Sequence, residues 1–203
     1  MRVLITVCVL SACIVGIISI FWHQEVKYAL PTPIPQNLKT VSILSKVDLI
    51  DIDQKKPLFI HFYNPDCPCS RFNASHVTQL IRNHGDSIQF IIVVPSSQDV
   101  AEAKRKFGES LTYSIDPENK IASACGVYST PQAVIITKDK SLYFRGNYNK
   151  SRYCTSQASN YAELALLSFI HNQPPPILEL RASLSYGCEL PGQTNSIVEI
   201  FCE

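Results

Sequence analysis

The sequence predicts an α/β fold in which a mixed central sheet is flanked by helices and preceded by an N-terminal transmembrane helix. Two continuous apolar runs, residues 57–63 (PLFIHFY) and 88–94 (IQFIIVV), are typical of strands buried on both faces of a sheet. Segments with a helical spacing of apolar residues alternate with these runs, which favours parallel neighbouring strands. An uncharged apolar run from Val3 to Trp22 opens the chain.

This first run has the length of a membrane span. As a helix, its 20 residues would extend about 30 Å, the thickness of a bilayer core. Arg2 and the amino terminus precede it, so the positive-inside bias places the N-terminus in the cytoplasm. A lipoprotein-like box at residues 10–13 offers an alternative in which Cys13 is acylated. We expect a single-pass protein of the inner (cytoplasmic) membrane whose soluble domain faces the periplasm or the cell exterior.

Changes in composition divide the chain into four parts. We expect a transmembrane anchor at 1–23, a proline-rich linker at 24–39, a folded domain at 40–172 and a tail at 173–203. The linker contains the sequence LPTPIP at residues 30–35, which is typical of a semi-rigid spacer. The tail has no strong periodicity and should pack irregularly on the domain.

Within the domain, strands and helices follow each other in a regular order. Glycines 85 and 108 mark the ends of the first two helices, and Asp116-Pro117 is typical of a helix start. The long connections in the first half imply parallel strands, whereas the four residues 138–141 imply an antiparallel hairpin. The expected elements are strand 57–63, helix 70–83, strand 88–94, helix 97–107, strand 112–115, helix 116–124, strands 133–137 and 142–145, and helix 161–171.

Charge and cysteine content narrow the function classes. The net charge of +1, without a basic block longer than residues 104–106, does not support nucleic-acid binding. Six of the eight cysteines lie outside the apolar run. That content suggests an oxidising compartment, a metal site or redox chemistry.

Two segments resemble the thioredoxin-like superfamily. Residues 59–67 (FIHFYNPDC) resemble the first core strand of a thioredoxin running into its active-site turn, and Thr130-Pro131 resembles the family's cis-proline. The resemblance covers about residues 40–172. The most similar group is a poorly characterised set of bacterial membrane-anchored proteins with a Pro-Asp-Cys-Pro-Cys turn and a Gly-Cys near the end, as in Gly187-Cys188. The resemblance to thioredoxins implies that Thr130 and Pro131 present their backbone to an extended substrate peptide.

The turn departs from the usual Cys-x-x-Cys, because its cysteines are Cys67 and Cys69 and Ser70 takes the second position. A cysteine at a helix N-terminus is stabilised as thiolate. Arg71 should strengthen this effect and Asp66 should oppose it. We therefore expect Cys67 to be the nucleophile and Cys69 the resolving thiol. A bond between cysteines two residues apart would be strained, which favours donating or shuffling disulfides.

Three further cysteine and histidine assignments follow. His61 takes the place of a buried acid that shuttles protons in thioredoxins, so it is either a proton shuttle or an ordinary core histidine. Cys154 and Cys188 flank the last helix, and we expect them to form a structural disulfide. Cys125 and Cys202 either form a disulfide with each other or remain thiols.

The leading hypothesis is an extracytoplasmic thiol–disulfide oxidoreductase that uses the Cys-x-Cys pair on protein substrates, with neither cofactor nor metal. A membrane redox partner is compatible with this topology. One alternative is Cu(I) binding or delivery, because two thiolates near His61 or His76 are soft ligands. Another alternative is a non-catalytic thioredoxin-like binding module with a structural disulfide.

Overall fold

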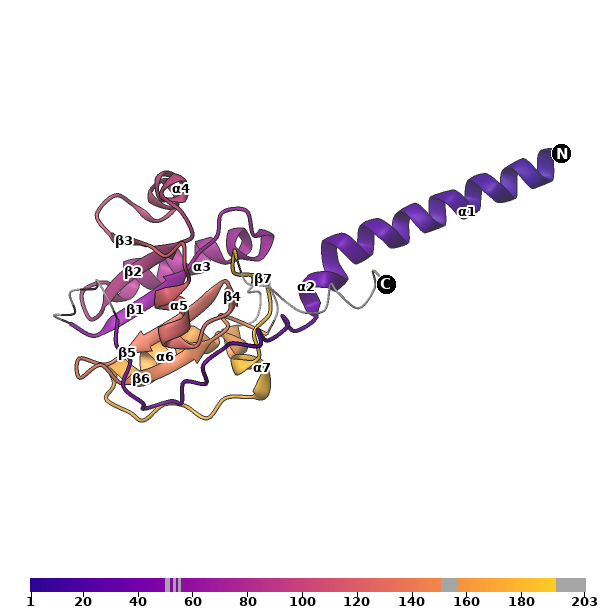
Figure 1. Cartoon of the computed structure of the whole chain (residues 1–203). Coiled ribbons are helices and arrows are strands. Elements are labelled where there is room, and N and C mark those ends of the chain that lie inside the picture. Colours follow the sequence, from indigo (N-terminus) through magenta and orange to yellow (C-terminus); the bar gives the residue numbers. More distant parts are fainter. Residues whose placement is uncertain (50–51, 53, 55, 151–156, 193–203) are drawn as a thin grey trace.

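A computed structural model of the 203-residue chain describes residues 1–49, 52, 54, 56–150 and 157–192 (Figure 1). The helices are α1 (Arg2–Phe21), α2 (Lys27–Ala29), α3 (Pro68–His84), α4 (Ser97–Phe107), α5 (Lys120–Cys125), α6 (Tyr161–Ile170) and α7 (Leu180–Ser183), and a π-helical segment (Trp22–Val26) joins α1 to α2. The strands are β1 (Leu58–Phe62), β2 (Gln89–Val94), β3 (Thr112–Ile115), β4 (Ser129–Thr130), β5 (Gln132–Ile136), β6 (Leu142–Gly146) and β7 (Cys188–Glu189).

The central sheet is mixed, as the sequence predicts. Its five strands run in the order β3-β2-β1-β5-β6. β1 pairs with β2 in parallel, and β2 with β3 in parallel, whereas β5 is antiparallel to both β1 and β6. β1 lies at the centre, and every one of its residues is buried. This position fits its continuous apolar sequence.

Helices cover both faces of the sheet. One hydrophobic cluster joins alternate residues of β1 and β2 to α3, α4 and α6. The other cluster joins the remaining alternate residues to α5 and to Val47 and Leu49 in the segment before β1. The two right-handed crossovers that lead from β1 through β2 to β3 place α3 and α4 on the same face. This arrangement confirms the predicted fold class.

Two predicted helix starts are wrong by a few residues. α3 begins at Pro68 rather than Ser70, because proline is well suited to the first helical position. α5 begins at Lys120 rather than at 116–118, because Asn119 has φ 53°, a left-handed conformation that no helix can include. The carboxylate of Asp116 instead accepts the Ala122 N–H at 2.9 Å from the preceding loop.

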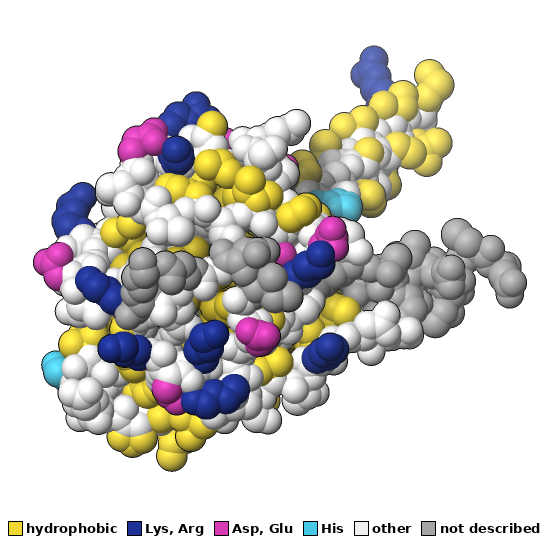
Figure 2. Space-filling model, turned by 60° about the vertical axis from the view of Figure 1, so that its left-hand side comes forward, with side chains coloured by type: hydrophobic (Ala, Val, Ile, Leu, Met, Phe, Trp, Pro, Cys, Tyr) yellow, Lys and Arg dark blue, Asp and Glu magenta, His cyan; other side chains and the backbone are white. Residues whose placement is uncertain are grey.

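The N-terminal helix projects away from the domain (Figure 1). Within the helical stretch Arg2–Val26, an 18-residue window has a mean hydropathy of 2.8, and none of that window is buried. In Figure 2 the surface of this helix is almost continuously hydrophobic, whereas charged side chains are scattered over the domain. Its length and composition suit a membrane anchor or a signal sequence.

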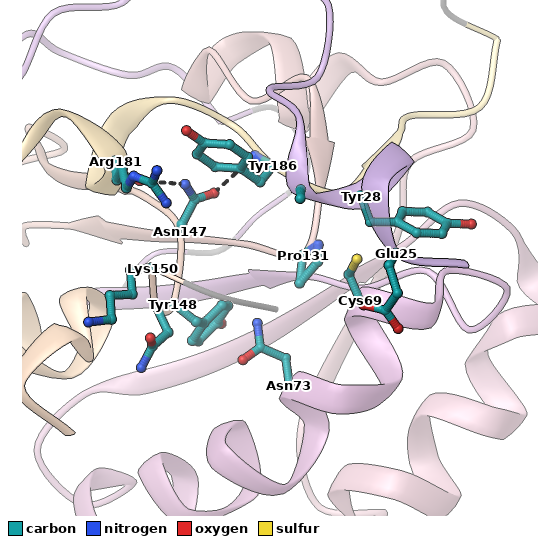
Figure 3. A pocket seen from close by; sticks show the side chains of 12 residues that line it. Glu25, Tyr28, Cys69, Asn73, Pro131, Asn147, Tyr148, Lys150, Arg181 and Tyr186 are labelled. Carbon is teal, nitrogen blue, oxygen red and sulfur yellow. Dashed lines mark hydrogen bonds between the residues drawn. The ribbon is translucent and has the colours of Figure 1, made fainter. Parts of the chain in front are cut away.

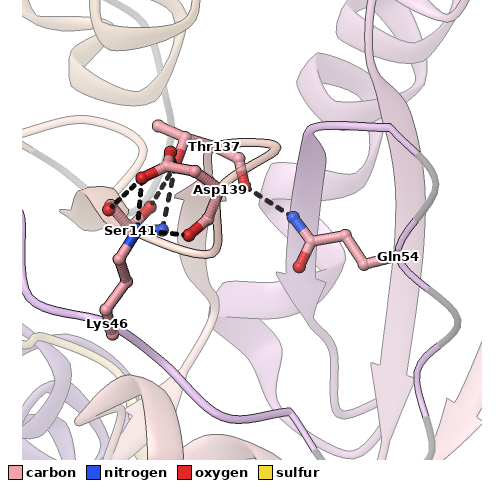
Figure 4. A network of polar contacts seen from close by, with 5 residues as sticks. All are labelled: Lys46, Gln54, Thr137, Asp139 and Ser141. Atoms are coloured by element: carbon pink, nitrogen blue, oxygen red, sulfur yellow. Dashed lines mark hydrogen bonds and ion pairs between the residues drawn. The ribbon is translucent and has the colours of Figure 1, made fainter.

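The segment before β1 is tied to the β5–β6 hairpin (Figure 4). Lys46 forms an ion pair with Asp139, and Gln54 Nε2 donates to the Thr137 carbonyl at 2.6 Å. The backbone of residues 44–47 also bonds with the hairpin, including Val47 N–H to Lys140 O at 2.9 Å. These bonds extend the sheet beyond β6.

The tail is more regular than the sequence predicts. It contains α7 and then β7, which pairs antiparallel with β4, so the expectation of an irregular tail is wrong for residues 180–189. The proline-rich linker contacts it: Pro31 forms an antiparallel bridge with Tyr186, and Thr32 N–H donates to Ser185 O at 2.8 Å.

Candidate active site

Cys67 lies at the start of α3, where the central strand β1 leads into the helix. It is the N-cap residue and is only 1% exposed. Its N–H donates to Asn64 O at 3.1 Å, and Ser70 Oγ accepts the Asn64 N–H at 3.4 Å. The serine that replaces the usual second cysteine therefore supports the turn that holds Cys67.

Cys67 forms a disulfide with Cys188 of β7, across a sequence separation of 121 residues and a Cα–Cα distance of 5.9 Å. The predicted Cys154–Cys188 bridge is thus wrong. The reason is tertiary, because pairing of β7 with β4 carries Cys188 across the domain to the start of α3. Cys154 and Cys202 lie outside the described residues.

The Thr130-Pro131 loop lies beside this disulfide. Its peptide bond is cis, as the resemblance implies. The Thr130 carbonyl oxygen is 3.4 Å from Cys67 Sγ, and Thr130 is the residue of β4 that pairs with Cys188. The loop therefore brings an extended, cysteine-containing strand against the Cys67 sulfur.

Cys69 keeps its thiol in this structure and is buried. It lines a cavity of about 230 Å³ together with Pro131, Asn73 and Tyr148 (Figure 3). In Figure 3 the Cys69 side chain lies near Pro131 and near Tyr28 of α2, and Tyr148 lies farther along the cavity. The structure thus places the two cysteines of the turn in different surroundings.

Cys188 borders a second cavity, of about 440 Å³, whose other wall comes from the segment that follows the N-terminal helix. Trp22, Tyr28 and Leu30 contribute to that wall. The disulfide therefore lies close to the point where the N-terminal helix joins the domain.

His61 is completely buried in β1, and Tyr148 is its hydrogen-bond partner. The Tyr148 hydroxyl lies 2.8 Å from His61 Nδ1. Burial lowers the pKa of His61 to about 3, and a backbone contact with Gln132 opposes this shift only in part. The imidazole is therefore neutral at physiological pH. Because Tyr148 also lines the cavity at Cys69, it connects His61 to that cavity.

The two charged residues of the turn lie on the surface. The Asp66 N–H donates to Asn64 Oδ1 at 2.9 Å, and its carboxylate is exposed. Arg71 is also exposed, and its Nη1 lies 3.5 Å from the Pro65 carbonyl oxygen. The guanidinium thus lies back over the turn that precedes Cys67.

Sequence patterns did not single out the residues that hold the tail. Asn147 Nδ2 donates to Arg181 O at 2.8 Å and to Leu184 O, and the Tyr186 N–H lies 3.4 Å from Asn147 Oδ1. Gln132 Nε2 donates to Ser185 Oγ at 2.6 Å. The sequence signal for these residues was the polar run Asn147-Tyr148-Asn149 directly after an apolar strand. The structure shows that this run is buried, and the partners of Asn147 are distant in sequence.

Among the described residues, the thiol and histidine groups do not gather into a metal site. Across residues 1–49, 52, 54, 56–150 and 157–192, no group of three or more His, Cys, Asp or Glu side chains could hold a metal ion. Cys125, the last residue of α5, is buried, and burial raises the pKa of its thiol to about 12.

Solved structures share this fold at low sequence identity. A hypothetical protein from Sinorhizobium meliloti is 14% identical with a TM-score of 0.62, over 75% of this chain and 95% of that one. An uncharacterized conserved protein from Geobacillus kaustophilus is 18% identical with a TM-score of 0.58, over 78% and 91%. A candidate thiol:disulfide interchange protein DsbE from Chlorobium tepidum is 14% identical with a TM-score of 0.51, over 64% and 99%. These structural matches show a thioredoxin-like fold, and at such low identity they show nothing beyond the fold.

Sequence comparison defines the family. No curated protein has a matching sequence. A family model described as a domain of unknown function, DUF6436, matches residues 38–189, which include Cys67, the cis-proline loop and Cys188. Because this match covers well over half of the chain, the protein belongs to the DUF6436 family.

Proposed function

We propose that the protein is an extracytoplasmic thiol–disulfide oxidoreductase that exchanges disulfides with protein substrates through Cys67. One observation carries the proposal: Cys67 Sγ is bonded to the cysteine of an extended strand that pairs with the cis-proline loop. An enzyme that attacks a cysteine in an extended peptide needs this arrangement at the moment of exchange.

The position of Cys67 suits a nucleophile. It caps α3, so the positive end of the helix dipole favours its thiolate once the disulfide opens. Arg71, one turn along, adds positive charge near the turn, and exposed Asp66 opposes it through solvent. We assign Thr130 and Pro131 as the substrate-binding loop.

Cys69 is assigned as the resolving thiol of a Cys-x-Cys pair. In the proposed step the Cys69 thiolate attacks Cys67 Sγ, a Cys67–Cys69 bond forms, the Cys67–Cys188 bond breaks, and Cys188 leaves as a thiolate that takes up a proton. A substrate thiolate then attacks Cys67 and releases Cys69, and a second substrate thiol completes the substrate disulfide. Two electrons pass from the substrate to the protein, which ends with all three cysteines reduced.

His61 enters this proposal as a positioning residue. With a pKa of about 3 it is neutral, and its Nδ1 can accept the Tyr148 hydroxyl proton in a hydrogen bond. Tyr148 lines the cavity that contains Cys69, so its orientation affects the surroundings of the resolving thiol.

The cellular setting is part of the same proposal. The helix at 1–23 would anchor the protein in the inner membrane, the segment 24–39 would link it to the domain at 40–172, and the tail at 173–203 would pack on that domain. The disulfide borders the cavity lined by Trp22, Tyr28 and Leu30, next to the proposed anchor. This position suits substrates or a redox partner at the membrane surface.

The test is oxidative refolding of a reduced, unfolded protein by the purified full-length chain in detergent micelles, without metal. Wild type should introduce disulfides, and Cys67→Ala should be at least 100-fold slower. Cys69→Ala should also be slow, because Cys69 would no longer open the Cys67–Cys188 bond before the substrate reacts. Cys125→Ala is the matched control, because Cys125 is another buried cysteine that belongs to the hydrophobic cluster under α5 and not to the disulfide, and it should behave as wild type.

One observation favours a second candidate, a binding module with a structural disulfide: Cys67 is almost fully buried beneath the docked tail. The two candidates differ in reduction potential. A structural disulfide should resist reduction by glutathione buffers, whereas an exchanging one should equilibrate with them. A bond that glutathione cannot reduce, together with no refolding activity, would establish the binding module.

A further inference from the structure

We propose that the tail segment 185–191 occupies a peptide groove as an internal substrate, and that protein substrates of this site carry an extended segment of the form Gly-Cys-x-Leu. This inference rests on the proposed function and specifies its substrate class. The segment contains Gly187, Cys188 and Leu190, and each makes a distinct contact with the domain.

The groove begins upstream of the cysteine, where polar groups fix the strand. Ser185 receives the Gln132 side-chain hydrogen bond at 2.6 Å, and its carbonyl accepts the Thr32 N–H. Asn147 Oδ1 lies 3.4 Å from the Tyr186 N–H. Most of these bonds engage the tail backbone, so they would hold a strand of different sequence equally well.

Gly187 determines which residue can precede the cysteine. Its φ is +137°, and a Cβ atom added there would lie 2.2 Å from the Thr130 carbonyl oxygen. That oxygen is held by the cis-proline loop, so it cannot move aside as a flexible side chain could. The position therefore requires glycine in a strand that follows the path of the tail.

Leu190 fills an apolar site beyond the cysteine. It is 5% exposed and belongs to the hydrophobic cluster that includes Phe62, Val93 and Ala122. The next residue is also held, because Asn119 Nδ2 donates to Pro191 O at 2.7 Å. An apolar side chain two residues after the cysteine would thus be selected, and a charged one would be rejected because it would lose its hydration there.

The tail and a substrate therefore compete for the same groove. Transfer of the Cys67 bond from Cys188 to Cys69 would remove the covalent link, but the contacts of Ser185 and Leu190 would still favour the docked tail. Substrates must displace these contacts, so an unmatched peptide is excluded even after the disulfide has opened.

The test uses full-length Cys188→Ser protein in detergent micelles and the octapeptide LSYGCELP, the sequence of residues 184–191, as a mixed disulfide with thionitrobenzoate. Cys67 attacks the peptide sulfur, the peptide–thionitrobenzoate bond breaks, and the coloured thionitrobenzoate anion leaves. Matched peptides carry aspartate in place of Leu190 or alanine in place of Gly187. The parent peptide should react at least about ten-fold faster than either, as expected for the loss of a buried leucine contact or a steric fit.

A second variant tests competition by the tail itself. Leu190→Asp added to the Cys188→Ser chain weakens tail docking only, so the parent peptide should react several-fold faster with it. Equal rates for the three peptides, with a normal reaction at Cys67, would overturn the groove and leave the proposed function intact. Failure of Cys67 to react with any peptide or with a small disulfide would overturn both.

Discussion

Replacing His61 with glutamine should flatten the acid limb of the stability curve. His61 is fully buried and its pKa is lowered to about 3, whereas an unfolded histidine titrates near 6.5. Between these values the unfolded chain binds a proton that the native protein does not. The native state is therefore destabilised progressively as the pH falls from about 6.5 towards 3, and it is unaffected above 6.5.

The magnitude follows from the size of the shift. One proton corresponds to about 1.4 kcal/mol per pH unit once the unfolded histidine is fully protonated, but only about half of that at pH 6.5. The free energy of unfolding should therefore fall by about 2 kcal/mol between pH 6.5 and 4.5. Glutamine retains a group that can bond to the Tyr148 hydroxyl, and it has no charge to acquire. The His61→Gln variant should be less stable at neutral pH but should lack this contribution to the slope.

The assay is urea unfolding of the full-length protein in detergent micelles, followed by circular dichroism at several pH values between 4.5 and 8. His171→Gln is the control, because it replaces an exposed histidine instead of the buried one. His76, whose pKa is also lowered by burial, is present in every variant and cancels in the comparison. Parallel acid limbs for wild type and His61→Gln would refute the reasoning.

Three other predictions concern the tail, the remote cysteine and the anchor. Asn147→Ala removes the hydrogen bonds to Arg181 and Leu184 and should weaken tail docking by about 1–3 kcal/mol. Cys188 should then be alkylated faster in the reduced protein, and an unchanged alkylation rate would contradict the prediction. Cys125, with a pKa raised to about 12, should resist iodoacetamide in the native protein at pH 8 and react after unfolding; rapid native labelling would contradict its assigned burial. The full-length chain should remain in the membrane fraction after an alkaline wash, and recovery of a soluble mature chain that begins near residue 25 would show that the helix is a cleaved signal.

The sequence alone determined the sheet and the turn at its centre. Apolar runs, glycine stops and connection lengths are local patterns. They predicted strands at 57–63 and 88–94, which the structure has at Leu58–Phe62 and Gln89–Val94, and the change from parallel to antiparallel pairing. The position of Thr130-Pro131 before a buried strand was equally local. Such features depend on residues within a few positions of one another, so periodicity is sufficient to find them.

Only the tertiary structure decided which cysteine bonds to Cys67 and which group contacts His61. Cys188 lies 121 residues from Cys67 in sequence, and Tyr148 lies 87 residues from His61. Disulfide connectivity cannot be deduced from cysteine positions when several partners are available, and the sequence favoured Cys154 as the partner of Cys188 because the two flank the last helix. The decisive contacts, from Asn147 and Gln132 to a tail without periodicity, join buried polar groups whose partners are chosen by the folded geometry and not by any repeating pattern.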